Sequence, residues 1–185
     1  DTKWQLLKTD CVVEDIHFRA DEKPARIGWK ALCRALSDIA AMGGVPESAL
    51  ITIAVRADVE FAHVRGIFSG MKRAARKFKV AIVGGETSRS PGPMFINVAL
   101  TGWVERKRCI RRSDGKPGDA LYVTGKLGGS GAGKHLDFTP RLAEAGWLGE
   151  NFPVHAMMDL SDGLGSDLPM LAAAGGCGFD LVREP

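Results

Sequence analysis

Residues 49–85, ALITIAVRADVEFAHVRGIFSGMKRAARKFKVAIVGG, contain the pattern that decides the fold. The two ends, residues 49–55 and 80–85, are short apolar runs with the length and β-branched content expected of buried strands. Between them, from Val59 to Phe78, basic residues alternate with apolar ones as on the solvated side of an amphipathic helix. A strand, a helix and a second strand in this order predict an α/β (α+β) fold.

Similar elements lie on both sides of this unit. Residues 4–13 predict a strand, and Pro24 opens a helical pattern that continues to about Met42 and stops at a Gly-Gly pair. Residues 94–104 predict a longer strand. Farther along, we expect strands over 120–125, 155–160 and 178–182, and helices over 140–148 and 166–174.

Residues 105–118 are basic, interrupted by glycine and proline, and poor in apolar side chains. Such a segment is typical of a domain boundary. We therefore predict an N-terminal α/β domain over residues 1–113 and the start of a C-terminal α/β domain over 114–185. Because the pattern begins at a strand and stops just after another, we expect the sequence to be part of a larger protein.

Composition narrows the class of protein. The chain has 185 residues and a net charge of +3, which is too small to indicate a nucleic-acid partner. No apolar run reaches the roughly 18 residues of a membrane span, and no signal-peptide pattern opens the chain. The four cysteines lie far apart without a C-x-x-C pair, so neither a zinc site nor a disulfide framework is indicated. We expect a cytoplasmic protein that binds neither nucleic acid nor membrane.

The stretch GGSGAGKH, residues 128–135, matches the first seven positions of a phosphate-binding P-loop. The eighth position is His135, where a P-loop needs Ser or Thr to hold magnesium. Pro140 also falls where the long phosphate-capping helix should run. We interpret Gly128 to Gly133 as a flexible turn, which could also close over a ligand.

Acidic side chains recur where predicted strands end or helices turn. Two such charges about 4 Å apart repel by roughly 4 kcal/mol at an effective dielectric near 20, so a convergent group needs cations. Carboxylate oxygens are the ligands that Mg²⁺ prefers, and the pattern favours a divalent-metal site. Taken one by one, the same residues also suit a helix surface, a turn or an N-cap, and spacing alone leaves both interpretations open. The residues are Asp10, Asp38, Glu86, Asp159 and Asp162.

Five blocks together resemble, in the same order, the motifs of the thiamine-monophosphate kinase family in the aminoimidazole-ribonucleotide synthetase superfamily. They extend from Thr9 to Leu168 and cover most of the chain. The blocks are TDCVVEDIHF (9–18), KALCRALSDIAAMGG (30–44), GGET (84–87), RRSDGKPGDALYVTG (111–125) and MMDLSDGLGSDL (157–168).

This resemblance implies an N-terminal α/β domain that dimerises with a second copy through its sheet, followed by an α/β C-terminal domain. It also implies a reaction, the Mg²⁺-assisted transfer of the γ-phosphoryl group of ATP to thiamine monophosphate, which gives thiamine diphosphate. The partners implied are thiamine monophosphate, ATP as co-substrate, and a second subunit of a homodimer.

Carried over position by position, the resemblance also implies site residues. Asp38 and Arg112 would stabilise the transferring group, and His17 would contact the substrate. His17 and Arg112 each have a plain alternative, since a lone histidine beside Phe18 is often only packed and Arg112 is one of several linker arginines. The implied metal ligands are Thr9, Asp10, Asp38, Glu86, Asp159 and Asp162, and the implied ATP contacts are Gly85, Glu86, Arg112 and Ser161.

The sequence departs from the family pattern in three ways. The family's G-D-D motif is absent from these residues, because Asp1 already lies beyond its place, Glu86 replaces the usual aspartate, and the stretch 128–142 is shorter than usual. Two other functions therefore stay open. One is a sibling ATP-using enzyme of the selenophosphate synthetase or hydrogenase-maturation type, and the other is a non-catalytic nucleotide-binding or dimerisation module.

Overall fold

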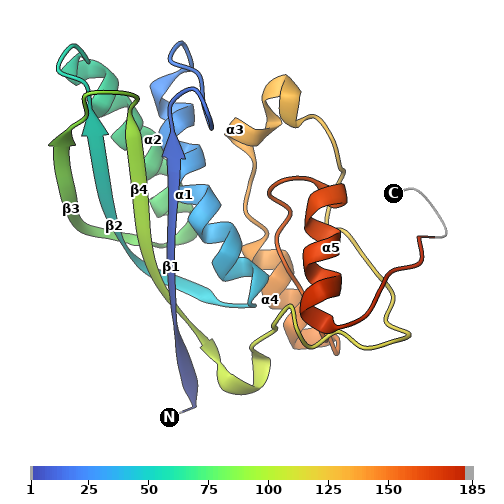
Figure 1. The fold of residues 1–185 in the computed structure, drawn as a ribbon. Helices are drawn as coiled ribbons and strands as arrows, with labels where there is room; N and C mark the ends of the chain where they lie inside the picture. Colours follow the sequence, from blue (N-terminus) through green and yellow to red (C-terminus); the bar gives the residue numbers. More distant parts are fainter. Residues whose placement is uncertain (1, 182–185) are drawn as a thin grey trace.

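The computed structural model describes residues 2–181. Its first part alternates strands with helices: β1 (Lys3–Val13), α1 (Pro24–Ala41), β2 (Val45–Val55), α2 (Phe61–Phe78), β3 (Ala81–Arg89) and β4 (Phe95–Glu105). The rest contains the short helices η1 (Arg106–Arg108) and α3 (His135–Asp137), the irregular turn η2 (Ser130–Lys134), and the helices α4 (Leu142–Asn151) and α5 (Leu164–Gly175). Figure 1 shows the sheet beside α1 and α2, with α4 and α5 on the far side of α1.

The sheet has four strands in the order β1-β4-β2-β3. Strand β4 is antiparallel to both β1 and β2, whereas β2 and β3 are parallel and are joined by α2. The strand, helix and strand of residues 49–85 thus form the expected crossover unit. A register shift between Ala49 and Leu50 interrupts the pairing of β2 with β3.

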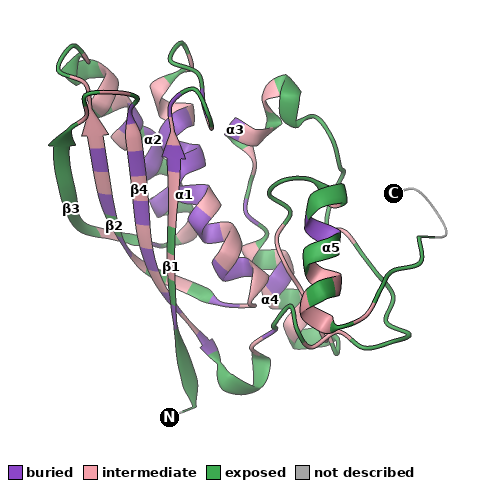
Figure 2. Ribbon diagram, in the orientation of Figure 1, coloured by how far each residue is buried: buried purple, intermediate pink, exposed green. Residues whose placement is uncertain are grey.

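One face of the sheet is buried under α1 and α2. Side chains alternate along β4, so that Ile96, Val98 and Leu100 point into this core while their neighbours are only partly buried. The alternation is visible as purple and pink bands in Figure 2. The opposite face carries exposed apolar side chains, among them Leu7 and Leu50.

The backbones of α1 and α2 are in direct contact at two glycines. A Cβ atom added at Gly28 would lie 1.9 Å from the carbonyl oxygen of Ile67, and one added at Gly70 would lie 1.9 Å from that of Ala25. Only glycine allows so close an approach. The two glycines therefore set how closely α1 and α2 approach each other.

The predicted elements of the first 105 residues are confirmed, with ends shifted by a few residues. The helices expected over 140–148 and 166–174 are also present, as α4 and α5. The strands expected over 120–125 and 155–160 are wrong, since neither segment pairs with a strand in residues 2–181. The same holds for 178–181, and residue 182 lies outside the described residues. Apolar runs become strands only where a partner supplies the hydrogen bonds of a ladder.

None of the described helices is long and apolar enough to cross a membrane.

Candidate functional site

Two of the predicted acidic residues meet where α1 faces the loop before α5. Asp38, on α1, forms an ion pair of 2.9 Å with Lys8 of β1. Asp159 lies close to this pair: burial, and after it the negative charge of Asp38, raises the pKa of the Asp159 carboxyl above its usual range. The structure thus brings two carboxylates from distant parts of the sequence into one neighbourhood.

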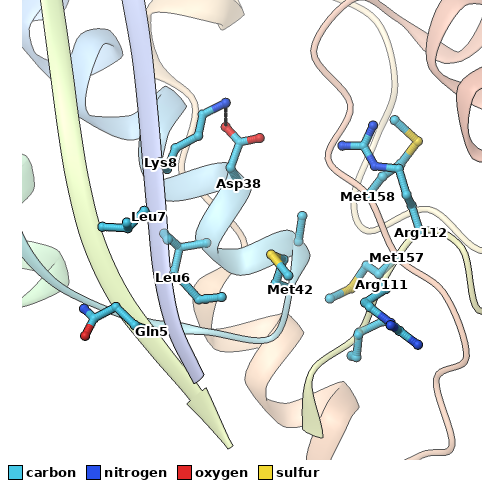
Figure 3. A pocket seen from close by; sticks show the side chains of 13 residues that line it. Gln5, Leu6, Leu7, Lys8, Asp38, Met42, Arg111, Arg112, Met157 and Met158 are labelled. Carbon is cyan, nitrogen blue, oxygen red and sulfur yellow. Dashed lines mark ion pairs between the residues drawn. The ribbon is translucent and has the colours of Figure 1, made fainter. Parts of the chain in front are cut away.

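A pocket of about 430 Å³ opens beside Asp38. Its walls are largely apolar, with Leu6, Met42 and Met157 among them. Figure 3 shows Asp38 and its Lys8 partner on one side of the pocket and Arg112 across from them. A guanidinium and a carboxylate–lysine pair that face each other over an apolar floor are suited to an anion with a bound cation.

Asp10 lies on the same face of β1 as Lys8 but has a different cation. Arg34 of α1 approaches its Oδ1 atom at 3.3 Å, and the N–H of Cys11 donates to that oxygen at 2.9 Å. The neighbouring Thr9 points to the opposite face, where its hydroxyl donates to Asn97 at 2.9 Å. Thr9 and Asp10 are therefore not on one side of the sheet, as successive strand residues cannot be.

His17 has a fixed tautomer. The N–H of Val13 donates to its Nδ1 atom at 3.0 Å, so Nδ1 accepts and the proton of the neutral ring is on Nε2. Burial, followed by the positive charges of Arg34 and Lys30, lowers the pKa of His17. The ring is thus a neutral hydrogen-bond donor near neutral pH, which suits an anionic ligand.

Glu86 lies apart from the other acidic residues within this chain. It is exposed on β3, aligned with Thr52 of β2, and β3 is separated from β1 by two strands. At about 4.8 Å per strand, that is on the order of 14 Å from β1. Gly85 precedes it with φ +152°, and a Cβ atom there would lie 1.8 Å from the carbonyl oxygen of Ile51.

The register shift in β3 explains the orientation of Glu86. Ala49 pairs with Ile82 and Leu50 with Gly84, so the pairing skips Val83. Without the skip, Glu86 would align with Ile53, whose side chain is fully buried in the core. With it, Glu86 aligns with Thr52 and lies on the open face, away from Asp10.

Ser161 and Asp162 lie on the exposed loop between Asp159 and α5. The N–H groups of both residues donate to the carboxylate of Asp167. Sequence reasoning did not single out Asp167, nor Lys8, Arg34 and Lys30, which contact predicted site residues. Asp167, Lys30 and Arg34 lie inside the quoted motifs, and that position was the only available signal.

A protein site for Mg²⁺ needs oxygen ligands that converge on one point. Across residues 2–181, no three His, Cys, Asp or Glu side chains are grouped closely enough to hold a metal ion. Asp38 lines the pocket, and its negative charge contributes to the raised pKa of the nearby Asp159, so these two carboxylates are the candidate pair. Because Mg²⁺ is commonly bound by one or two carboxylates together with substrate phosphates and waters, this pair fits such an ion.

The glycine-rich stretch is a turn, as predicted, and has no P-loop geometry. Lys134 donates to the carbonyl oxygens of Lys126 and, at 3.1 Å, of Gly128, so its ammonium is bound within its own loop. The following helix, α3, has three residues instead of a long phosphate-capping run. The end of the loop is attached to α1, where Arg26 donates to the Gly133 carbonyl at 3.2 Å.

Known proteins with similar sequences point to one family. Residues 1–104 match the family model "AIR synthase related protein, N-terminal domain". The chain is 41% identical to the thiamine-monophosphate kinase of Rhodopirellula baltica, over 97% of this chain and 57% of that protein. It is 33% identical to the thiamine-monophosphate kinase of Aquifex aeolicus, over 99% of this chain and 65% of that protein.

Solved structures with a similar fold agree with these sequence relatives. AaThiL complexed with AMPPCP and TMP superimposes with a TM-score of 0.88 at 34% identity, over 95% of this chain and 62% of that one. HypE of Escherichia coli, a hydrogenase maturation protein, gives 0.82 at 25% identity, over 94% and 59%. The chain spans less than two thirds of the length of these relatives. With more than half of its residues matching the family model on the expected fold, the chain belongs to the AIR synthase related protein family.

Proposed function

We propose that the protein transfers the γ-phosphoryl group of ATP to thiamine monophosphate and so forms thiamine diphosphate. The observation that carries this proposal is the pocket with Asp38 and Lys8 on one side and Arg112 on the other, with Asp159 close to Asp38. The names of the relatives support the choice of substrate, since those at 31–41% identity are thiamine-monophosphate kinases.

The attacking group in this reaction is a phosphate oxygen that is already ionised near neutral pH, so no strong base is required. Positioning and charge neutralisation then dominate the lowering of the barrier. Arg112 can offer two parallel N–H groups to one phosphate. His17 can donate from Nε2 while it stays neutral, because Nδ1 is occupied by the N–H of Val13.

We further propose that Asp38 and Asp159 hold Mg²⁺, with Asp10 and Asp162 as additional ligands and Ser161 as an ATP contact. Thr9 and Glu86 lie on the other face of the sheet in this chain, so we propose them, with the neighbouring Gly85, as cation and ATP contacts of a site shared with the second subunit. Held by these residues, Mg²⁺ would supply positive charge to the phosphates of the substrates. Lys8 neutralises Asp38 in its absence, and Arg34 does the same for Asp10. Without these cations, the neighbouring carboxylates would repel one another.

The activity is tested by incubating the protein with ATP, Mg²⁺ and thiamine monophosphate and separating thiamine diphosphate by chromatography. Asp38→Asn should lower the rate by at least about 100-fold, because it removes a charge from the proposed cation site. Asp58→Asn, at an exposed position in the turn before α2, is the matched control and should retain the wild-type rate.

Absence of product from the wild type would reject the proposed reaction. Consumption of ATP without thiamine diphosphate would point instead to a sibling enzyme such as the hydrogenase-maturation type. Undiminished product from Asp38→Asn, with circular dichroism unchanged, would reject the role of Asp38.

We also propose that the protein is a homodimer formed through the open face of the sheet. Leu7 and Leu50 are exposed there, with Leu7 80% accessible, and an apolar face of this kind favours a protein partner. Glu86 lies on the same face and would then be at the interface. Sedimentation equilibrium at micromolar concentration should give twice the mass of one chain, and a monomer mass would contradict the proposal.

The four free thiols suit the reducing cytoplasm, where we infer that the protein works.

A further inference from the structure

The carboxylate of Asp167 is buried and binds the loop in front of its own helix. Asp167 lies in the first turns of α5 and is only 1% exposed. Its Oδ2 atom accepts hydrogen bonds from the N–H groups of Ser161 at 2.9 Å, Asp162 at 3.0 Å and Gly163 at 3.1 Å. One oxygen thus gathers three successive backbone donors.

Burying a carboxylate costs free energy, because the charged group loses its contact with water. In the part of the chain that the structure describes, no lysine, arginine or histidine forms an ion pair with Asp167. Its charge is compensated by the three N–H groups, which form charge-assisted hydrogen bonds. The loop does not need the carboxylate to satisfy these donors, because Ser161, Asp162 and Gly163 are exposed and water could reach them. What the carboxylate adds is a fixed loop conformation.

The loop conformation matters because of the side chains that the loop carries. Gly163 has φ +97°, a left-handed conformation that lets its N–H turn towards Asp167 together with the two before it. With the backbone amides held inwards, the side chains of Ser161 and Asp162 are exposed to solvent. Asp159 lies at the start of the same loop, close to Asp38.

We propose that Asp167 is a positioning residue, which holds the loop so that Asp159, Ser161 and Asp162 can bind Mg²⁺ and nucleotide. The inference rests on the proposed function, since the role of the loop is part of it. Asp167 itself contacts the backbone of the loop and is not a ligand. Residues that orient metal ligands in this way typically change metal affinity or activity by about 10- to 100-fold when they are replaced.

Three variants separate this role from simple stability. Asp167→Leu keeps the approximate size and removes the acceptor, whereas Asp167→Asn keeps an acceptor oxygen and removes the charge. Ser166→Ala is the matched control, because Ser166 is the exposed neighbour on the same helical turn.

The first measurement is amide hydrogen exchange of Ser161, Asp162 and Gly163. Exchange should be fastest in Asp167→Leu, intermediate in Asp167→Asn, and unchanged in Ser166→Ala. This readout does not depend on enzymatic activity, and it remains informative for Asp167→Asn if the leucine variant does not fold. Equal protection in all four proteins would overturn the proposed anchoring.

The second measurement is Mg²⁺ dependence, by calorimetric titration in the presence of AMPPCP and by the Mg²⁺ concentration that gives half-maximal rate. Asp167→Leu should require about 10- to 100-fold more Mg²⁺, while the KM for thiamine monophosphate stays within about twofold. Loss of thermal stability with unchanged Mg²⁺ dependence would make Asp167 structural only and overturn the proposal.

The two hypotheses fail in different ways. A wild-type protein that binds Mg²⁺ with AMPPCP more tightly than Asp167→Leu but makes no thiamine diphosphate would reject the reaction and keep the positioning role. Product formation that is equally sensitive to Mg²⁺ in both proteins would keep the reaction and reject the positioning role.

Discussion

Residues 3–105 and residues 109–181 contain similar apolar runs, yet only the first region forms a sheet. In the first region, each run lies beside another strand and buries one face under α1 and α2. In the second, the runs at 120–125 and 155–160 pair with no described strand, and Tyr122 is 87% exposed. The difference shows that an apolar run forms a strand only beside another strand, because a single strand leaves its backbone N–H and C=O groups unpaired.

Helices are also packed more closely in the first region than in the second, as the surroundings of Gly28 and Gly146 show. Substituting each of these glycines tests the difference. Gly28→Ala would push a Cβ atom against the Ile67 carbonyl, and we expect destabilisation by about 3 kcal/mol or more. Gly146→Ala on α4 meets no atom within 4 Å and should instead stabilise by about 0.5–1 kcal/mol. Urea denaturation measures both.

Equal losses in the two glycine variants would show that α4 is packed as tightly as α1. A neutral Gly28→Ala would mean that α1 and α2 separate easily, which would contradict the close contact that defines the first region.

A smaller effect is expected at the contact between the regions. Lys30 of α1 donates to the His17 carbonyl and lies 2.6 Å from Nδ1 of His135, in the second region. Burial, and then the charge of Arg34, lowers the pKa of Lys30 to about 8. The unfolded chain keeps this proton up to about pH 10.5, so between pH 8 and 10.5 the unfolded state binds more protons and stability rises with pH.

Lys30→Met should abolish this rise, which amounts to at most about 3 kcal/mol. The free energy of unfolding in urea at pH 7.5, 8.5 and about 10 is the measurement. Lys72→Met, at an exposed position of α2, is the control and should keep the wild-type pH dependence. A wild-type profile in the Lys30 variant would contradict the titration of this lysine as the cause.

Local signals were sufficient for much of the fold. Pro24 marks the first turn of α1, and the Gly-Gly pair lies just beyond its end, as the sequence predicts. The mixed sheet order depends on contacts between residues far apart in the chain, and periodicity does not encode it. The division into domains at residue 113 stays a prediction.

The geometry of the candidate site was only partly predictable from the sequence, and its metal and nucleotide chemistry stays a proposal. Asp38 and Asp159 come together as a convergent acidic site requires. The face on which Glu86 lies could not be read from the sequence, because it depends on one skipped residue, Val83, in the pairing of two strands. The cations that balance the carboxylates, Lys8 and Arg34, were missed because their partners are distant in sequence.

The self-closed loop ending at Lys134 has a consequence for chemical modification. Its ammonium holds the carbonyl oxygens of Lys126 and Gly128, within a stretch whose glycines have high conformational freedom. Acetylation of this one lysine would remove the charge and most of the donors, and the loop would open into an extended exposed strap. Such a strap is a preferred cutting site for proteases, so acetylation of Lys134 would make this loop more sensitive to limited digestion.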